Sequence, residues 1–276
     1  MRPKLVMSSN PSSNKDIDVD FAIKSGFDGV DWSFDSDRMP FNNESRSQFF
    51  SQIRRLRGHQ IEVRFHTPFR NAEIGHRDHR IARRAMELHL ETLGLIAKVK
   101  GQFLTLHVGL GNIADEEVCF KRVQENLKAL NALAITRGIT ITLENLRHGP
   151  TSIPEQWIEL LKEARIPATF DFGHAKACDA VTKGLWNPLA ILNLVKERLI
   201  HAHIYKEENG KEHLPPKTIG DLGIDLLDAL METSCRWWVI ELRERKVALD
   251  VKKMLEAYIV LWKKGHCRRL RRAGLG

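Results

Sequence analysis

Six positions in the sequence place a potential metal ligand at or near the end of a short apolar segment. They are His66, His107, Glu144, Asp171, His203 and Glu241. A mixed set of imidazole nitrogens and carboxylate oxygens is one that zinc, manganese or cobalt accepts. The same groups can also remove and return protons. The six residues therefore predict a divalent-metal site with acid–base chemistry beside it.

The segment around Asp171 shows this pattern most clearly. The apolar run 166–172 contains Asp171 near its end, and His174 follows three residues later. A short apolar run bounded by turn-forming residues is typical of a buried strand. Gly173 lets the chain turn, so we expect His174 to fold back beside Asp171. Such a pair is suited to holding a metal or to moving a proton.

The rest of the chain alternates short apolar runs with longer amphipathic ones. The predicted strands cover 4–7, 28–32, 61–66, 102–107, 140–144, 166–172, 199–203 and 237–241. The predicted helices cover 19–24, 45–57, 78–100, 115–137, 154–162, 188–196, 224–231 and 250–263, and a polar loop covers 206–221. Eight strand–helix units indicate parallel strands that close into a barrel. We predict a single (β/α)8 TIM barrel over residues 1–262, with outer helices, and a basic tail over residues 263–276.

The predicted barrel brings the six candidate ligands together, because the carboxyl ends of its strands meet on the face that carries active sites. Side chains alternate along a strand, so residues two positions earlier face the same interior. These residues are Arg64, Thr105, Thr142, Thr169 and His201. We expect this largely polar layer to line a wet, functional mouth.

Charge and composition narrow the class of protein. The formal net charge is +8, and Lys263, Lys264, Arg268, Arg269, Arg271 and Arg272 contribute six of these charges. The tail is either a frayed, solvated terminus or an arm that contacts nucleic acid. No apolar run approaches the ~20 residues of a membrane span, and the first residues lack the features of a signal peptide. Four scattered cysteines predict reduced thiols, and together these features predict a soluble cytoplasmic protein.

Several short motifs, in order along residues 5–260, resemble the xylose-isomerase-like TIM barrels. The motifs are Phe65-His66-Thr67-Pro68, Leu106-His107-Val108-Gly109, Leu143-Glu144-Asn145, Phe170-Asp171-Phe172-Gly173-His174, His203-Ile204 and His213-Leu214-Pro215-Pro216. This superfamily contains sugar and sugar-phosphate isomerases and epimerases, and also the endonuclease IV type of apurinic-site endonuclease. The resemblance is specific for the superfamily and leaves both activities open. It is also compatible with a homo-oligomer.

In the isomerase branch, the resemblance implies one divalent ion (Mn, Zn, Co or Mg) held by a Glu, Asp, His, Glu set. The matching residues are Glu144, Asp171, His203 and Glu241. The implied reaction is proton transfer next to a sugar carbonyl, through an enediolate that the metal stabilises. Glu144 and Glu241 are the expected bases, and His174 and His213 are expected to bind substrate hydroxyls. The substrate would be a carbohydrate whose identity is read by loop positions such as Trp32.

In the endonuclease branch, the resemblance implies up to three zinc ions and a nucleic-acid partner. The matching ligands are His66, His107, Glu144, Asp171, His174, His203, His213 and Glu241. The branch also uses an aspartate two residues before the last histidine, where this chain has Lys211. A protonated lysine cannot replace that ligand, which favours the isomerase. Across the two branches, four histidines are expected to bind either substrate or additional metal: His66, His107, His174 and His213.

Overall fold

The computed structural model describes residues 2–9, 15–34, 42–109, 117–210 and 212–265. Residues 266–276, which hold most of the predicted basic tail, lie outside the described part of the chain. The same is true of Lys211, the residue in the position of the aspartate that the endonuclease pattern requires. The boundary between barrel and tail therefore stays a prediction.

Eight parallel strands close into a barrel, as the sequence predicts. Around the barrel the strands follow the order β1-β10-β7-β6-β5-β4-β3-β2. Their bounds are β1 Lys4–Ser9, β2 Gly29–Ser33, β3 Glu62–His66, β4 Phe103–Leu106, β5 Thr140–Glu144, β6 Ala168–Asp171, β7 Leu199–Ile204 and β10 Trp237–Ile240. β1 pairs with both β2 and β10, so neither end of the sheet is left open. The molecule is a single (β/α)8 TIM barrel.

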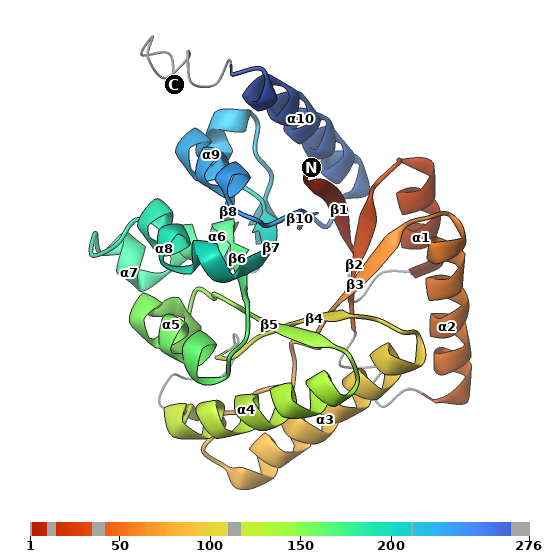
Figure 1. Cartoon of the computed structure of the whole chain (residues 1–276), viewed down its shortest axis with the longest axis vertical. Helices are drawn as coiled ribbons and strands as arrows, with labels where there is room; N and C mark the ends of the chain where they lie inside the picture. The colour runs from red at the N-terminus through yellow and green to blue at the C-terminus, as the bar shows by residue number, and fades with distance from the viewer. Residues whose placement is uncertain (1, 10–14, 35–41, 110–116, 211, 266–276) are drawn as a thin grey trace.

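Helices surround the barrel on its outer side (Figure 1). The main ones are α1 Lys15–Lys24, α2 Asn43–Gly58, α3 His79–Lys98, α4 Phe120–Thr136, α5 Pro154–Glu163, α8 Pro188–Val195, α9 Ile224–Glu232 and α10 Arg245–Lys263. Two shorter helices, α6 Phe172–Ala177 and α7 Asp179–Thr182, follow β6. Within the described ranges there are also the 3₁₀ turns η3 Pro150–Ser152, η4 Lys196–Arg198 and η5 Ile219–Leu222. Each predicted strand and helix is present, with ends that differ by up to five residues.

The start of α4 differs from the prediction for a physical reason. The helix was predicted from residue 115 with acidic residues in its first turn, but it begins at Phe120. Val118 instead forms an antiparallel bridge with His76, and the Cys119 N–H donates to the Gly75 carbonyl over 2.8 Å. These backbone bonds hold the chain extended immediately before the helix. Residues 110–116 lie outside the described part of the chain.

The predicted polar loop 206–221 is also more ordered than expected. It contains a two-stranded antiparallel hairpin, β8 Glu207–Asn209 and β9 Glu212–Leu214, followed by η5. Gly210 adopts a φ of 61° at the turn, a conformation that glycine reaches without steric cost. Lys176 of α6 donates to the backbone carbonyls of Lys206 and Asp221, which fastens both ends of the segment to the barrel. The segment is therefore a built element at the mouth.

The hydrophobic core lies mainly between the strands and the helices. Outward-facing strand residues such as Phe65, Leu104 and Ile141 are fully buried there against helical residues such as Leu93 and Leu127. Inside the barrel a separate small cluster joins Val6, Trp237 and Val239. Burying this apolar surface drives closure of the barrel and leaves the barrel interior available for polar side chains.

The polar interior layer predicted from alternation is present, but it is dry. Thr105, Thr142, Thr169 and His201 are fully excluded from solvent. The three threonine hydroxyls bond to one another, with 2.6 Å between those of Thr142 and Thr169. Arg64 donates to Nε2 of His201 over 2.6 Å, and Nδ1 of His201 lies 3.2 Å from the Thr105 hydroxyl. The expectation of a wet layer was wrong, because these groups satisfy one another and form a floor beneath the site.

Arg64 is held in this floor by two aromatic rings. Its guanidinium carbon lies 3.9 Å from the ring centre of Phe103 and 4.3 Å from that of Trp237. It also bonds to Glu62, which keeps the charge paired. Burial, together with the charge of Arg64, holds the pKa of His201 well below its usual value. His201 is therefore a neutral structural histidine.

A search of the helices found none that is both long and apolar enough to cross a membrane, within the ranges that the structure describes.

His89 on α3 gives a test of the packing outside the barrel. Its Nε2 donates to the Ala72 carbonyl over 2.9 Å, while its buried Nδ1 has no hydrogen-bond partner among the described residues. Burial lowers the pKa of His89 to about 4. Unfolded histidine has a pKa of about 6.5, so the folded chain binds fewer protons between these values and loses stability as pH falls.

We expect the lowered pKa of His89 to reduce the free energy of unfolding by about 2 kcal/mol as pH falls from 7 to 5. The variant His89→Gln should lose that part of the pH dependence, measured by urea unfolding at both pH values. His59→Gln, on the exposed end of α2, is the matched control and should behave like the unaltered chain. An unchanged pH dependence in His89→Gln would contradict the argument.

Candidate functional site

Glu144, the last residue of β5, is the centre of the site at the mouth of the barrel. Its Oε2 lies 3.3 Å from Nε2 of His66, 3.1 Å from Nε2 of His107 and 3.3 Å from Nδ1 of His203. Its Oε1 lies 3.2 Å from Nδ1 of His174. The side chain is 1% exposed. The structure thus brings together residues from four strand ends and from α6, as the sequence predicts.

Four donors form the largest candidate metal group among the described residues: Glu144, Asp171, His203 and Glu241. One ligand atom from each lies within 4.8 Å of the others. Nδ1 of His203 is 2.9 Å from Glu241, 3.3 Å from Glu144 and 3.7 Å from Asp171.

These donors face one another at ion-pair distances from His203, and several of their atoms lack an aligned hydrogen bond. His203 Nδ1, Asp171 Oδ2 and Glu241 Oε2 are buried, and none is aligned for a hydrogen bond within the described residues. Buried polar atoms are normally hydrogen-bonded, so unaligned donors that face one another fit a shared cation. One imidazole with three carboxylates suits zinc, manganese, cobalt or magnesium.

The carboxylates of the four-donor group differ in the direction in which their pKa is shifted. Burial acts to raise the pKa of Glu144, but His203 and His107 outweigh it and hold that pKa well below its usual value. The pKa of Glu241 is lowered in the same way by His203 and His213. Burial, with the charges of Glu144 and Glu241, raises the pKa of Asp171 to about 6. Glu144 and Glu241 are therefore the two carboxylates of this group that stay ionised to the lowest pH, and Asp171 is the first to take up a proton as pH falls.

Local structure positions Asp171 and His174. The Asn145 side chain accepts from the Asp171 N–H over 2.7 Å and donates to the Asp171 carbonyl over 3.0 Å. Asp171 then caps α6 by accepting from the His174 N–H over 2.7 Å. His174 does fold back, with Nδ1 3.6 Å from Asp171, as predicted.

The reason for glycine at position 173 differs from the prediction. Gly173 lies within α6 and needs no unusual backbone angle. A Cβ at this position would lie 2.0 Å from the ring of Tyr205. Glycine is therefore required for close packing of α6 against β7 and the residue that follows it.

Three histidines of the mouth have one ring nitrogen turned to a backbone carbonyl. Nδ1 lies 3.2 Å from the Thr67 oxygen in His66, 3.0 Å from the Asn145 oxygen in His174, and 3.0 Å from the Glu241 oxygen in His213. A carbonyl oxygen only accepts, so each Nδ1 carries the proton. In its neutral form each ring then presents a lone pair at Nε2 to the site, as in histidines prepared to bind a metal.

Glu208 joins the site from the hairpin, and sequence analysis did not assign it a role. It pairs with His213 across β8 and β9, and its Oε2 lies 3.6 Å from Nε2 of His174. Donor atoms of His174, Glu208 and His213 lie within 4.8 Å of one another. The His213 ring stacks on Tyr205, with centroids 4.1 Å apart. The acidic pair before Gly210 was visible in the sequence, but only the hairpin brings Glu208 opposite His213.

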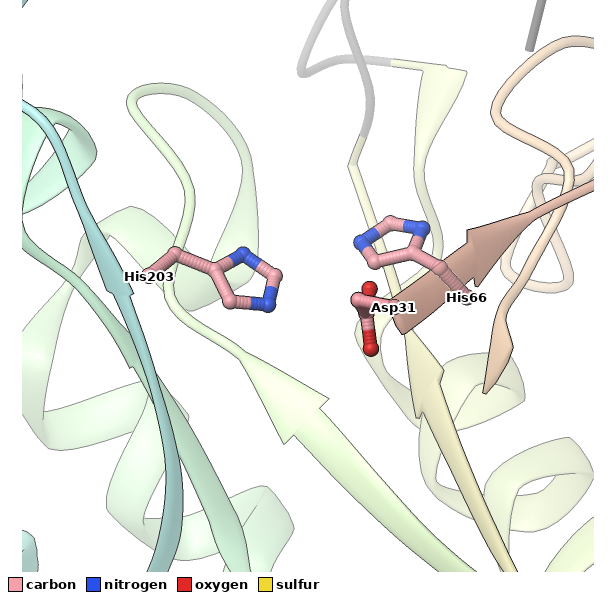
Figure 2. A group of neighbouring side chains, drawn as sticks. All are labelled: Asp31, His66 and His203. Carbon is pink, nitrogen blue, oxygen red and sulfur yellow. The ribbon is translucent and has the colours of Figure 1, made fainter. Parts of the chain in front are cut away.

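Asp31 of β2 was also missed, because it lies inside a strand rather than at its end. It is 1% exposed and groups with His66 and His203, with ligand atoms within 4.8 Å of one another (Figure 2). A further group combines His66, His107 and Glu144. The sequence did contain a signal for Asp31. It is an acidic residue two positions before Ser33 in the same strand, so both side chains face the barrel interior.

Trp32 is not a loop residue that faces the mouth. It lies in β2, is 3% exposed, and packs edge-on against Phe49 of α2 with ring centroids 5.7 Å apart. Successive strand residues point to opposite sides, so Trp32 faces the helices while Asp31 and Ser33 face the barrel interior. The expectation that Trp32 contacts the substrate was wrong.

We expect Asp171→Asn to weaken binding of Mn²⁺ or Zn²⁺ by at least about tenfold. Asparagine can still cap α6, so the loss should reflect the missing charged donor and not a local unfolding. Isothermal titration calorimetry measures the affinity, and Asp179→Asn at the exposed start of α7 is the control. Equal affinities of Asp171→Asn and the control would exclude Asp171 as a ligand.

Comparisons with known proteins agree on the fold. The family model described as xylose isomerase-like TIM barrel matches residues 19–258. An uncharacterised protein of Methanocaldococcus jannaschii is 32% identical over 171 residues, which cover 61% of this chain and 72% of that protein.

Solved structures with the same fold include proteins described as epimerases. A D-tagatose 3-epimerase-like protein has a TM-score of 0.74 and 21% identity, over 95% of this chain and 99% of its own. An L-ribulose 3-epimerase has a TM-score of 0.70 and 14% identity, over 99% and 98% of the two chains. A 3-keto-D-glucoside 4-epimerase from E. coli, in its apo form, has a TM-score of 0.67 and 14% identity, over 94% and 99%. At these identities the likeness shows a shared fold.

Proposed function

The chain belongs to the xylose isomerase-like TIM barrel family, and from that premise we propose that it is a divalent-metal-dependent isomerase or epimerase of a sugar or sugar phosphate. The observation that carries the proposal is the convergence of Glu144, Asp171, His203 and Glu241 within 4.8 Å. Similarly folded proteins that are named as epimerases, such as the L-ribulose 3-epimerase, support the same reaction class.

Glu144 and Glu241 are the proposed acid–base pair. Glu144 ends β5 and Glu241 follows β10, and two strands, β6 and β7, separate these elements around the barrel. The two carboxylates therefore approach the mouth from different sides. Both have a lowered pKa and are ionised at neutral pH, so either can accept a proton.

The proposed chemistry is proton transfer at a carbon next to a carbonyl. One carboxylate removes the proton, and the other returns it on the opposite face or to the adjacent carbon. A divalent cation held by the four-donor group supplies Lewis-acid stabilisation of the negative charge on the sugar oxygens. The buried floor below Glu144 excludes water from one side, which strengthens electrostatic interactions at the reacting carbon.

The remaining histidines are proposed to orient the substrate. His107, His174 and His213 are partly exposed and border the same mouth as Glu144 and Glu241. Burial acts to lower the pKa of His174, but the carboxylates of Asp171 and Glu144 raise it to about 10. A cationic His174 can donate to a sugar hydroxyl or to a phosphate oxygen.

We expect Glu144→Gln and Glu241→Gln each to lower turnover of a sugar substrate by about 10²- to 10⁴-fold, the usual contribution of one general base. Proton NMR in D₂O would follow exchange of solvent deuterium into candidate ketoses and their phosphates. Each variant is assayed at a metal concentration that saturates its own site. A slower reaction then reflects the missing base and not weaker metal binding. Glu163→Gln on the outside of α5 is the control, and exchange at the unaltered rate in either site variant would remove that residue from the mechanism.

A second candidate function is cleavage of apurinic-site DNA with a multi-zinc cluster. The observation that favours it is Glu208, whose carboxylate lies beside His174 and His213. It could replace the aspartate of the Asp-x-His pattern, where this chain has Lys211. Three donor groups then line the mouth: the four-donor group, the group of His66, His107 and Glu144, and the hairpin group. Glu144 belongs to two of them, and a carboxylate has two oxygens with which to bridge two ions.

Metal stoichiometry separates the two functions. The isomerase proposal predicts one tightly held ion per chain, measured by elemental analysis after dialysis, and no change in Glu208→Gln. Three zinc ions per chain, with one lost in Glu208→Gln, would favour the nuclease. Incision of an abasic-site duplex by the zinc-loaded chain would then decide between the activities, with Glu212→Gln on the same hairpin as the control.

A further inference from the structure

Asp31 is a buried carboxylate that the proposed mechanism does not use. Neither of its oxygens has a hydrogen-bond partner among the described residues, although the side chain is almost fully buried. Its register neighbour on β3 is Arg64, but that guanidinium is engaged with Glu62 and His201. Buried carboxylates normally have a partner, because an unpaired one loses its hydration without compensation. Asp31 must therefore face a group that needs it.

Asp31 faces the rings of His66 and His203. His66 already turns its Nε2 to Glu144, so His203 is the ring whose Nε2 lacks a hydrogen-bond partner among the described residues. Nδ1 of His203 lies among the carboxylates of the four-donor group, closest to Glu241 at 2.9 Å. The opposite nitrogen, Nε2, is turned toward Asp31 and His66 (Figure 2). That nitrogen is buried and has no hydrogen-bond partner within the described part of the chain. Two unpartnered buried groups thus meet inside the barrel, with ligand atoms no more than 4.8 Å apart.

The tautomer of His203 decides what Asp31 can do. A neutral imidazole has one lone pair and one N–H. When Nδ1 gives its lone pair to a cation in the four-donor group, Nε2 must carry the proton. His66, His174 and His213 each satisfy their Nδ1 proton with a backbone carbonyl. His203 has no such carbonyl bond, so its proton needs another acceptor, and Asp31 lies where that acceptor is required.

We propose that Asp31 is the positioning residue of His203: its carboxylate accepts the Nε2 proton, directly or through one bridging water, and so directs Nδ1 to the metal. This proposal rests on the proposed function in taking His203 as a metal ligand. A carboxylate in this position fixes the tautomer and ring orientation of a ligating histidine and raises its basicity. A water can bridge the two groups at little energetic cost if direct contact is not made.

Asp31, His66 and His203 do not form an ion site of their own while an ion occupies the four-donor group. An ion held by Asp31, His66 and His203 would need the lone pair of His203 at Nε2. That tautomer places the proton on Nδ1, among Glu144, Asp171 and Glu241, and removes the imidazole ligand from the four-donor group. The four-donor group has three carboxylates for a cation, whereas the Asp31 group has one, so the cation favours the former.

The test compares Asp31→Asn with the unaltered chain, using Zn²⁺ as the probe. Zinc affinity is measured by competition with a chromophoric chelator, and stoichiometry by elemental analysis. Long-range ¹H–¹⁵N NMR of ¹⁵N-histidine-labelled protein reports which nitrogen of His203 carries the proton. Asp228→Asn, a buried carboxylate on α9 that accepts from Tyr258, is the control for loss of a buried charge far from the mouth.

We expect Asp31→Asn to bind zinc about 10- to 100-fold more weakly, at unchanged stoichiometry, and to lose the single Nε2–H tautomer of His203. Asp31→Glu should recover part of the affinity, because it restores the carboxylate. Unaltered affinity and tautomer in Asp31→Asn would overturn the proposal, and so would loss of one ion per chain, which would make Asp31 a ligand. The proposed function fails together with this inference if the unaltered chain binds no zinc and Asp171→Asn changes nothing. If the unaltered chain binds zinc and only Asp31→Asn has no effect, this inference alone fails.

Discussion

The closest packing of charge in this molecule is around Glu144, whose carboxylate contacts four imidazole rings in a nearly solvent-free space. A buried carboxylate is expensive unless positive groups or a cation surround it. The geometry can exist only because each contacting residue is fixed at the end of a different strand of a closed barrel. Closure of β1 against β10 therefore underlies the site as much as the fold.

The barrel divides its interior into two layers with different purposes. In the floor, His201 and three threonines are excluded from solvent and bond to one another and to Arg64. In the mouth, Asp171 Oδ2, His203 Nδ1 and Glu241 Oε2 converge with Glu144, and these three atoms have no aligned hydrogen bond within the described residues. A satisfied polar layer is rigid, and it holds the strand ends at fixed distances. The unsatisfied layer above it can then keep a geometry suited to a bound cation and its substrate.

The mouth also has one component outside the barrel strands. The β8–β9 hairpin is fastened by Lys176, and it places Glu208 and His213 beside His174. Both functions proposed for this chain would use this same mouth. The hairpin is where the two proposals for this chain differ, since Glu208 offers the extra carboxylate that a third ion would need.

The sequence by itself determined the fold and most of the strand-end residues that meet at the mouth. Period-two alternation and helical periodicity are local properties, so they identified eight strand–helix units and the strand ends His66, His107, Glu144, Asp171 and His203. They could not show that the threonine layer is dry, because solvent exclusion depends on how eight strands pack around a common axis. Nor could they place Asp31 beside His203 or Glu208 opposite His213. Those contacts join residues far apart in the chain or across a hairpin, and strand register and barrel closure set their distances.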